Sequence, residues 1–311
     1  MRIFFASSES IALEVFKKVS DQYNVVGVLT APDKPSGRGL SVKANDIKIE
    51  AISRNIAVLD PLVLNSDVIE MVKGLKPDLM LVFSYGKIFR QEFLDIFPMG
   101  CINVHPSLLP KYRGPSPIQT AILNGDTISG ITVQKMALEM DSGNILSQSQ
   151  FEIKSFNTSS DICRYVSLSS SDIVLEALSK LNAGYVGISQ DASQATFCYF
   201  FNKQYRVLDF NLSAFEIKNR INACNPWPLA RAKLDDYEII FHRADFIKTN
   251  DYSDHAIGQI VSFDPNRGIF VNTKDGILLL LELQRAGKKV MDYKSFYNGN
   301  RDLVGKVFLK F

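Results

Sequence analysis

The sequence is poor in the residues from which metal and redox sites are built. Its 311 residues include only three histidines and four cysteines, and the cysteines lie far apart, at Cys101, Cys163, Cys198 and Cys224. No C-x-x-C spacing occurs and no pair of histidines accompanies them, so we expect neither a zinc site nor a redox pair. The expected arrangement is free thiols, buried or incidental, in a reducing compartment.

Two further absences narrow the class of protein. No apolar stretch approaches the ~20 residues that a membrane span requires, and residues 1–6 enter a strand-like run directly, without the composition of a signal or transit segment. We therefore expect a cytoplasmic protein. The fingerprint G-x-G-x-x-G is missing too, because no third glycine follows Gly37 and Gly39 at the required step, and this argues against a nicotinamide cofactor.

Net charge does not indicate a general nucleic-acid coat. The formal charge is only +2, but it is unevenly distributed: residues 191–311 carry 17 Lys and Arg against 14 Asp and Glu, whereas residues 1–190 carry 18 against 19. A polyanionic partner is therefore better placed on the last third of the chain than on the rest.

What is present favours two domains of different class. Continuous apolar runs at residues 2–6, 25–30 and 78–83, with helical spacing between the first two, are typical of parallel strands covered on both faces. They predict an α/β domain with a Rossmann-like, mostly parallel sheet. Short strand patterns with helix-poor connections occupy residues 237–283 and predict a small β-barrel of the oligonucleotide-binding (OB) type.

The boundary between these domains is expected where periodicity fails. Residues 184–205 are mixed polar and aromatic without sustained periodicity. We therefore predict a catalytic domain at residues 1–184, a linker at 185–204 and an OB-like domain at 205–311.

One polar cluster is not explained by the fold alone. Asn103 and His105 stand two residues apart before Pro106, so both side chains leave the same face of a strand at its carboxyl end. An imidazole beside a carboxamide offers a proton-transfer group and a neutral donor, as acyl-type transfer requires. Asp141, in a polar turn, is the acid that could orient the imidazole. Each residue also has an ordinary explanation, a hydrogen-bonded strand end for His105 and a turn former for Asp141.

These residues carry a resemblance to a known family. Asn103, His105, the run 107–110, and Asp141 with Gly143 resemble the active-site signature of the 10-formyltetrahydrofolate-dependent formyltransferases. The resemblance implies 10-formyltetrahydrofolate as co-substrate and no metal. It further implies the catalytic residues Asn103, His105 and Asp141, a folate site at Ser107, Leu108, Leu109 and Pro110, and a pterin pocket at Phe83, Ser84, Tyr85 and Gly86.

The resemblance extends to segments outside this signature. The loop P-D-x-P-x-G-R-G at residues 32–39 is similar to one that enters the acceptor stem in tRNA-dependent members of the family, and residues 225–228 and 283–289 resemble their C-terminal domain. The implied reaction is formyl transfer to the α-amino group of the methionyl ester on initiator tRNA, by a monomer. The implied tRNA contacts are Lys34, Arg38, Arg285, Lys288 and Lys289.

Two alternatives stay open at the level of sequence. One is a folate-dependent formyltransferase that acts on a small amine, such as glycinamide ribonucleotide or an amino-sugar nucleotide; the 32–39 loop and the last domain argue against it. The other is a non-catalytic folate- or RNA-binding module, against which the joint occurrence of Asn103, His105 and Asp141 argues.

Overall fold

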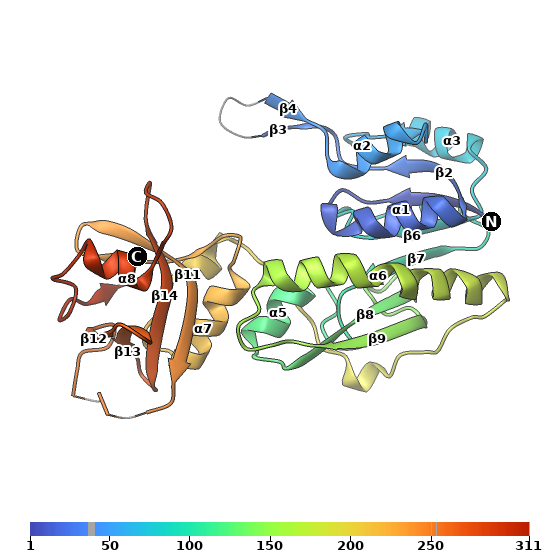
Figure 1. The fold of residues 1–311 in the computed structure, drawn as a ribbon. Coiled ribbons are helices and arrows are strands. Elements are labelled where there is room, and N and C mark those ends of the chain that lie inside the picture. Colours follow the sequence, from blue (N-terminus) through green and yellow to red (C-terminus); the bar gives the residue numbers. More distant parts are fainter. Residues whose placement is uncertain (37–40, 250, 253, 311) are drawn as a thin grey trace. The chain divides into compact units, whose positions relative to one another are not determined.

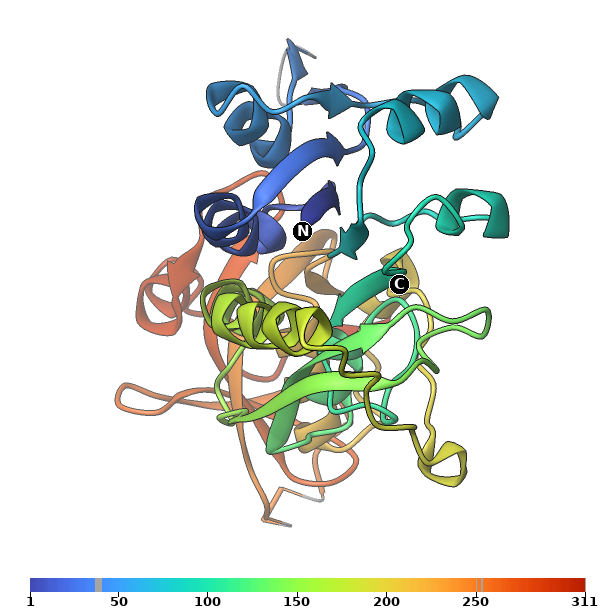
Figure 2. The same ribbon diagram turned by 90° about the vertical axis from the view of Figure 1, so that its right-hand side faces the viewer.

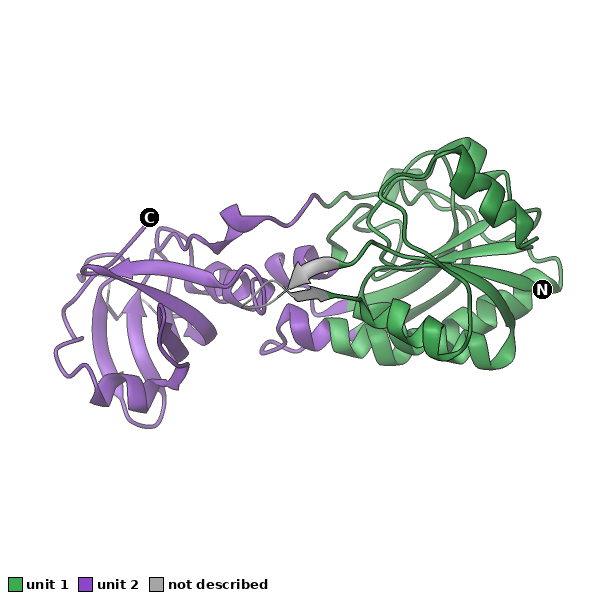
Figure 3. Cartoon of the chain, turned by 90° about the horizontal axis from the view of Figure 1, so that it is seen from above, with its two compact units in different colours: residues 1–117, 129–151, 163–198 green, residues 118–128, 152–162, 199–311 purple. Residues whose placement is uncertain are grey.

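The computed structural model describes residues 1–36, 41–249, 251–252 and 254–310. The chain divides into two compact units (Figure 3). The first comprises residues 1–117, 129–151 and 163–198, and the second comprises residues 118–128, 152–162 and 199–311. Residues 185–198, which fall in the expected linker, thus belong to the first unit.

A seven-stranded, mostly parallel sheet organises the first part of the chain (Figure 1). The strands from β5 to β7 are parallel, and β8 runs antiparallel to β7. The predicted α/β architecture is confirmed. In spatial order the strands are β5 (Val58–Leu59), β2 (Asn24–Leu29), β1 (Arg2–Ala6), β6 (Leu79–Val82), β7 (Cys101–His105), β8 (Ile128–Lys135) and β9 (Ile145–Glu152).

Helices lie on both faces of this sheet (Figure 2). Neighbouring residues of β1 show why, since alternation sends their side chains to opposite faces. Phe5 meets Phe16 of α1, with ring centroids 5.1 Å apart, whereas Phe4 belongs to the core cluster that contains Val72 of α3. The helices are α1 (Leu13–Gln22), α2 (Asp46–Ser53), α3 (Ser66–Gly74), α4 (Gln91–Leu94), α5 (Pro117–Leu123) and α6 (Ser159–Asn182).

The Pro- and Gly-rich loop contains more regular structure than its composition predicts. Two prolines and two glycines in residues 31–40 disfavour regular structure, yet β3 (Lys34–Ser36) and β4 (Ser41–Lys43) pair as two antiparallel strands. Proline is compatible with this two-stranded sheet, because both strands are edge strands and alternate N–H groups of an edge strand have no partner in the sheet. Arg38 lies outside the described residues.

The second unit holds an antiparallel sheet that curls on itself. Its edges are joined by hydrogen bonds from the Ile260 N–H to the Lys306 carbonyl and from the Phe308 N–H to the Gly258 carbonyl, both at 2.8 Å. This closure is what an OB-like barrel requires, and the predicted class is confirmed. The strand order is β12 (Ile260–Asp264), β13 (Gly268–Asn272), β14 (Ile277–Arg285), β11 (Tyr237–Ile247), β10 (Ala230–Leu234) and β16 (Phe308–Leu309), with β15 (Met291–Asp292) beside β14.

Helix α7 (Ala214–Ala223) packs against β11 and β14 of this sheet and begins with a capping box formed by Ser213 and Glu216. The helix also buries a charge. Lys218 is 3% exposed, lines a cavity of about 100 Å³, and has its Nζ 3.4 Å from the Asn219 Oδ1. Burial lowers the pKa of Lys218 below its ordinary value of 10.5. A short helix, α8 (Tyr293–Asn298), follows β15.

This buried ammonium predicts a stabilising substitution. The pKa in the folded state lies below that in the unfolded state, so the charge opposes folding at neutral pH and this effect fades as the pH rises toward 10.5. We expect Lys218→Met to raise the midpoint of thermal unfolding at pH 7 by a few degrees, since about 1 kcal/mol corresponds to roughly 2–4 °C. The gain should shrink at pH 9.5. The exposed Lys248→Met is the control, and a lower midpoint for Lys218→Met at pH 7 would contradict the prediction.

Candidate active site

Asn103 and His105 lie on β7 and face two side chains of β8. The antiparallel register places Asn103 opposite Gln134 and His105 opposite Thr132. Residues directly opposite each other in such a pair share one face of the sheet. This face, near the carboxyl end of the last parallel strand, therefore carries an imidazole, two carboxamides and a hydroxyl.

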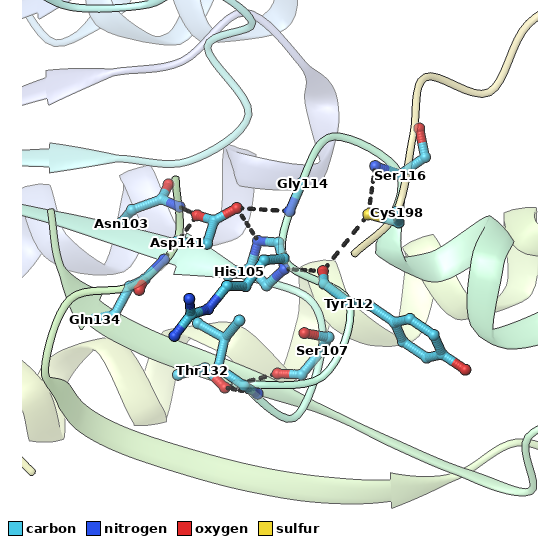
Figure 4. Close-up of polar contacts among 12 residues, drawn as sticks. Asn103, His105, Ser107, Tyr112, Gly114, Ser116, Thr132, Gln134, Asp141 and Cys198 are labelled. Atoms are coloured by element: carbon cyan, nitrogen blue, oxygen red, sulfur yellow. Dashed lines mark hydrogen bonds and ion pairs between the residues drawn. The ribbon is translucent and has the colours of Figure 1, made fainter. Parts of the chain in front are cut away.

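The carboxylate of Asp141 enters this group from the turn between β8 and β9 (Figure 4). Its Oδ1 accepts hydrogen bonds from Gln134 Nε2 at 2.7 Å and from Asn103 Nδ2 at 3.4 Å. Its Oδ2 accepts the Gly114 N–H at 2.9 Å and lies 3.6 Å from His105 Nδ1. The structure thus brings together the amide, the imidazole and the carboxylate that the sequence singled out.

Both ring nitrogens of His105 face oxygen atoms of the protein. Its Nε2 lies 2.9 Å from the Tyr112 carbonyl oxygen. A carbonyl only accepts, so Nε2 carries a proton. The other nitrogen, Nδ1, lies 3.6 Å from the Asp141 carboxylate. Both ring nitrogens of His105 are thus occupied by protein oxygens. The half-buried Asn103 amide is held less firmly, because its hydrogen bond to Asp141 is long.

The segment after β7 is braced against the neighbouring strands. The Ser107 hydroxyl donates to the Lys111 carbonyl at 2.6 Å, and the Thr132 hydroxyl donates to the Ser107 carbonyl at 2.6 Å. The Leu109 carbonyl accepts a hydrogen bond from Gln148 at 3.1 Å. Ser107 and Leu109 are buried, whereas Leu108 and Pro110 are half-buried. The polar groups of Ser107 are therefore engaged inside the protein.

The corner after β6 places its residues unequally. Phe83 is buried in the core and its N–H donates to the Ala6 carbonyl at 3.0 Å. Ser84, with φ +54°, and Gly86 are exposed. The Tyr85 ring is buried against Phe89, with centroids 5.2 Å apart, and its hydroxyl makes no hydrogen bond to any described residue. Burial raises the pKa of Tyr85 to about 12.

Comparison with known proteins identifies the family of this chain. The chain matches the family model described as formyl transferase over residues 2–178, and the one described as formyl transferase, C-terminal domain, over residues 201–301. The protein belongs to the formyl transferase family. A relative from Borrelia hermsii named methionyl-tRNA formyltransferase is 84% identical over 308 residues, which cover 99% of this chain and 100% of the relative.

Solved structures show the same fold at low identity. An N-formyltransferase from Helicobacter canadensis, solved with folinic acid and dTDP-3-aminofucose, is 19% identical with a TM-score of 0.62 over 92% of this chain and 99% of its own. HypX from Aquifex aeolicus, solved with tetrahydrofolic acid, is 17% identical with a TM-score of 0.61 over 97% of this chain. This formyl transferase spans about half, 48%, of that HypX chain.

Several residues of the site escaped the sequence analysis. Gln134 could have been found, because alternation along the apolar run 131–136 pairs it with Asn103 once β7 and β8 are recognised as neighbours. Arg113, Gly114 and Gln190 reach the site from loops, and no local pattern signals their approach.

The residues expected to contact tRNA in this formyl transferase are only partly described. Arg285, Lys288 and Lys289 are exposed in and beside the turn between β14 and β15, and the Arg285 guanidinium lies 4.0 Å from the centroid of the Tyr237 ring. The side chain of Lys34, on β3, and the whole of Arg38 lie outside the described part.

The described residues contain no group of three or more His, Cys, Asp or Glu side chains that could hold a metal ion. No helix among them is long and apolar enough to cross a membrane.

The close packing of the Asp141 turn generates a stability prediction. A Cβ at Gly143 would clash with the Lys135 carbonyl oxygen, whereas a Cβ at Gly74 in α3 would meet nothing within 4 Å. We expect Gly143→Ala to reduce the free energy of unfolding by about 1–3 kcal/mol, as overpacking does, and Gly74→Ala to leave it unchanged or raise it by up to about 1 kcal/mol. Urea unfolding of the two variants checks this; equal stability would show that the turn yields without strain.

Proposed function

We propose that this formyl transferase moves the formyl group of 10-formyltetrahydrofolate to the α-amino group of L-methionyl initiator tRNA, giving N-formylmethionyl-tRNA for translation initiation. The observation that carries the proposal is the 84% identity to the Borrelia hermsii methionyl-tRNA formyltransferase, which extends over that relative's whole length. Both family domains are present, so the identity covers the catalytic domain and the C-terminal domain alike.

A small-amine substrate is the alternative. The Helicobacter canadensis enzyme, solved with dTDP-3-aminofucose, has the same fold over 92% of this chain. Fold alone therefore does not separate the two substrates. The difference between 19% and 84% identity favours the tRNA substrate.

Asn103 is proposed to stabilise charge on the formyl oxygen. When bound, the folate co-substrate supplies a formyl group whose oxygen gains negative charge as an amine attacks its carbon. Asn103 is half-buried, and the one hydrogen bond that its Nδ2 makes among the described residues, to Asp141 Oδ1, is long at 3.4 Å. It can therefore turn to a new acceptor at little cost. We propose that a protonated His105, whose ring nitrogens face Tyr112 and Asp141, adds positive charge near this oxygen.

Asp141 is proposed to hold the imidazolium and to take part in moving the proton from the attacking amine toward the departing nitrogen. Its Oδ2 is 3.6 Å from His105 Nδ1, and its side chain is 13% exposed, which leaves a path for the amine or for a water molecule. The donors from Gln134 and Gly114 hold the carboxylate in place beside the imidazole.

The corner at Phe83–Gly86 and the segment 107–110 are proposed to receive the folate. Ser84 and Gly86 are exposed at the end of β6, where polar groups suit a heteroaromatic ring, and the buried Tyr85 ring supports this corner. The buried Phe83 and Leu109 and the engaged Ser107 hydroxyl contribute shape and backbone rather than side-chain hydrogen bonds. The braced segment 107–110 supports a rigid wall.

The remaining assignments concern the tRNA and the whole protein. We propose that Lys34, Arg38, Arg285, Lys288 and Lys289 contact tRNA phosphates, with salt-dependent affinity. We propose that the catalytic domain at 1–184, extended by residues 185–198 of the predicted linker, acts on the folate and that the domain at 205–311 binds the tRNA. We infer that the protein acts in the cytoplasm, because its substrate is consumed by translation, and that it acts as a monomer.

One assay tests the substrate. Purified protein with 10-formyltetrahydrofolate and charged initiator tRNA should yield formylmethionine after hydrolysis of the ester. The control reaction offers glycinamide ribonucleotide and an amino-sugar nucleotide in place of the tRNA. Product only with a small amine would establish the alternative enzyme, and no product with any amine would leave a binding module.

A variant series tests the catalytic assignment. We expect Asn103→Ala, His105→Ala and Asp141→Ala each to lower kcat in that assay by roughly 100–1000-fold, the usual loss for one oxyanion donor. Asn298→Ala, an exposed position at the end of α8, should retain parental activity. Thermal unfolding measured alongside separates lost chemistry from lost structure. Full activity in any one of the three folded variants removes that residue from the mechanism.

A further inference from the structure

Residues 112–114 contact both His105 and Asp141. The Tyr112 carbonyl accepts from His105 Nε2 at 2.9 Å, and the Gly114 N–H donates to Asp141 Oδ2 at 2.9 Å. The residue between them, Arg113, is 3% exposed. A buried guanidinium stays charged and must find acceptors for its N–H groups.

The acceptors of Arg113 come from far along the chain. Its Nε and Nη2 both reach the Gln190 Oε1, at 3.2 and 2.9 Å, and its Nη1 lies 3.4 Å from the exposed Glu139. Gln190 is held nearby by the segment that contains it. The Ile188 N–H and carbonyl pair with those of Ile145, and the Arg113 N–H donates to the Thr196 carbonyl at 2.8 Å. Residues 188–196 are thus built into the first unit beside the site.

The guanidinium decides which way the Gln190 amide points. Two N–H donors converge on one end of that amide, so this end is the oxygen and the other end is the NH₂ group. The NH₂ group then donates to the carbonyl oxygens of Asp141, at 2.9 Å, and Gly143, at 2.7 Å. A single side chain therefore holds both ends of the tripeptide 141–143.

Gln134 holds the carboxylate itself. Its NH₂ group donates to Asp141 Oδ1 at 2.7 Å, so its Oε1 is the end that lies 3.2 Å from Gln190 Nε2. Buried Arg113 thus sets the orientation of Gln190, and the two glutamines together hold the backbone and the carboxylate of Asp141.

The Asp141 turn requires such tethers. Residues 137–140 are exposed, so little apolar packing fixes the turn, and Asp141 itself has φ +51°, a conformation that non-glycine residues seldom adopt. Strained backbone of this kind persists only where its surroundings impose it.

We propose that Gln190, oriented by Arg113, is a positioning residue that clamps the Asp141 turn so that the carboxylate meets His105. The inference rests on the proposed function of Asp141 in formyl transfer. Gln190 does not touch the reacting atoms, and its effect is to keep the carboxylate within the narrow range of positions that catalysis tolerates.

Two substitutions separate positioning from simple packing. Gln190→Glu keeps the size of the side chain and the acceptor for Arg113, but it cannot donate to the Asp141 and Gly143 carbonyls. Gln190→Ala removes both functions. The control is Gln194→Glu, which makes the same chemical change at an exposed side chain of the same segment that donates to Asp191.

Kinetics and hydrogen exchange are measured on the full chain. We expect kcat for formylation of methionyl initiator tRNA to fall roughly 10–100-fold in both Gln190 variants, with KM for each substrate within about twofold, because ground-state binding is untouched. Exchange of the Gly114 N–H, which donates to Asp141 Oδ2, should accelerate about tenfold or more in both. Gln194→Glu should change neither quantity.

The two readouts keep the outcomes distinct. An inactive parent chain refutes the proposed function, and the exchange measurement still tests the clamp. Unchanged Gly114 exchange in Gln190→Glu overturns the clamp whatever the activity. If Gln190→Ala alone is impaired while Gln190→Glu matches the parent, Gln190 serves only to pair the buried guanidinium and the proposal is wrong.

Discussion

A carboxyl group that is only 13% exposed needs hydrogen-bond donors from the protein to replace the water that it has lost. Asp141 has donors from the side chains of Asn103 and Gln134 and from the backbone of Gly114, with the His105 ring at 3.6 Å. This one carboxyl group therefore ties β7, β8, the turn at 112–114 and the β8–β9 turn into a single arrangement. The remaining features of the site either supply those donors or keep them in place.

The sheet provides this arrangement by changing strand direction next to its last parallel strand. After a connection that contains α5, the antiparallel β8 places Gln134 directly opposite Asn103 on β7. The chain then needs only a short turn between β8 and β9 to return Asp141 to the same face. His105 and Asp141 are thus 36 residues apart in the sequence, but the pairing of β7 with β8 brings their side chains together.

The sequence predicts most of the scaffold because its signals are local. Continuous apolar runs indicate the parallel strands, and period-two alternation places Asn103 and His105 on one face. The contacts that hold Asp141 could not be predicted, because they are not local in the sequence. Arg113 and Gln190 are 77 residues apart and meet through loops, where neither periodicity nor turn chemistry specifies a partner. Polar, aperiodic residues 185–198 have the composition of a linker, although their hydrogen bonds place them in the first unit.

The catalytic groups and the residues that select the substrate are separate, and this explains how one fold can act on different amines. The groups proposed to act on the formyl transfer all come from the first unit, from residues 103–141 with Gln190 as support. They recognise charge that develops on the formyl group and on an amine, features common to every acceptor of the family. Selection among acceptors must then come from contacts with the rest of the substrate, because binding energy far from the reacting atoms is what distinguishes molecules with the same reactive group. For a tRNA, whose surface is mostly phosphate, such contacts require exposed cations. Arg285, Lys288 and Lys289, which stand on a turn of the barrel and have no part in its core, meet this requirement.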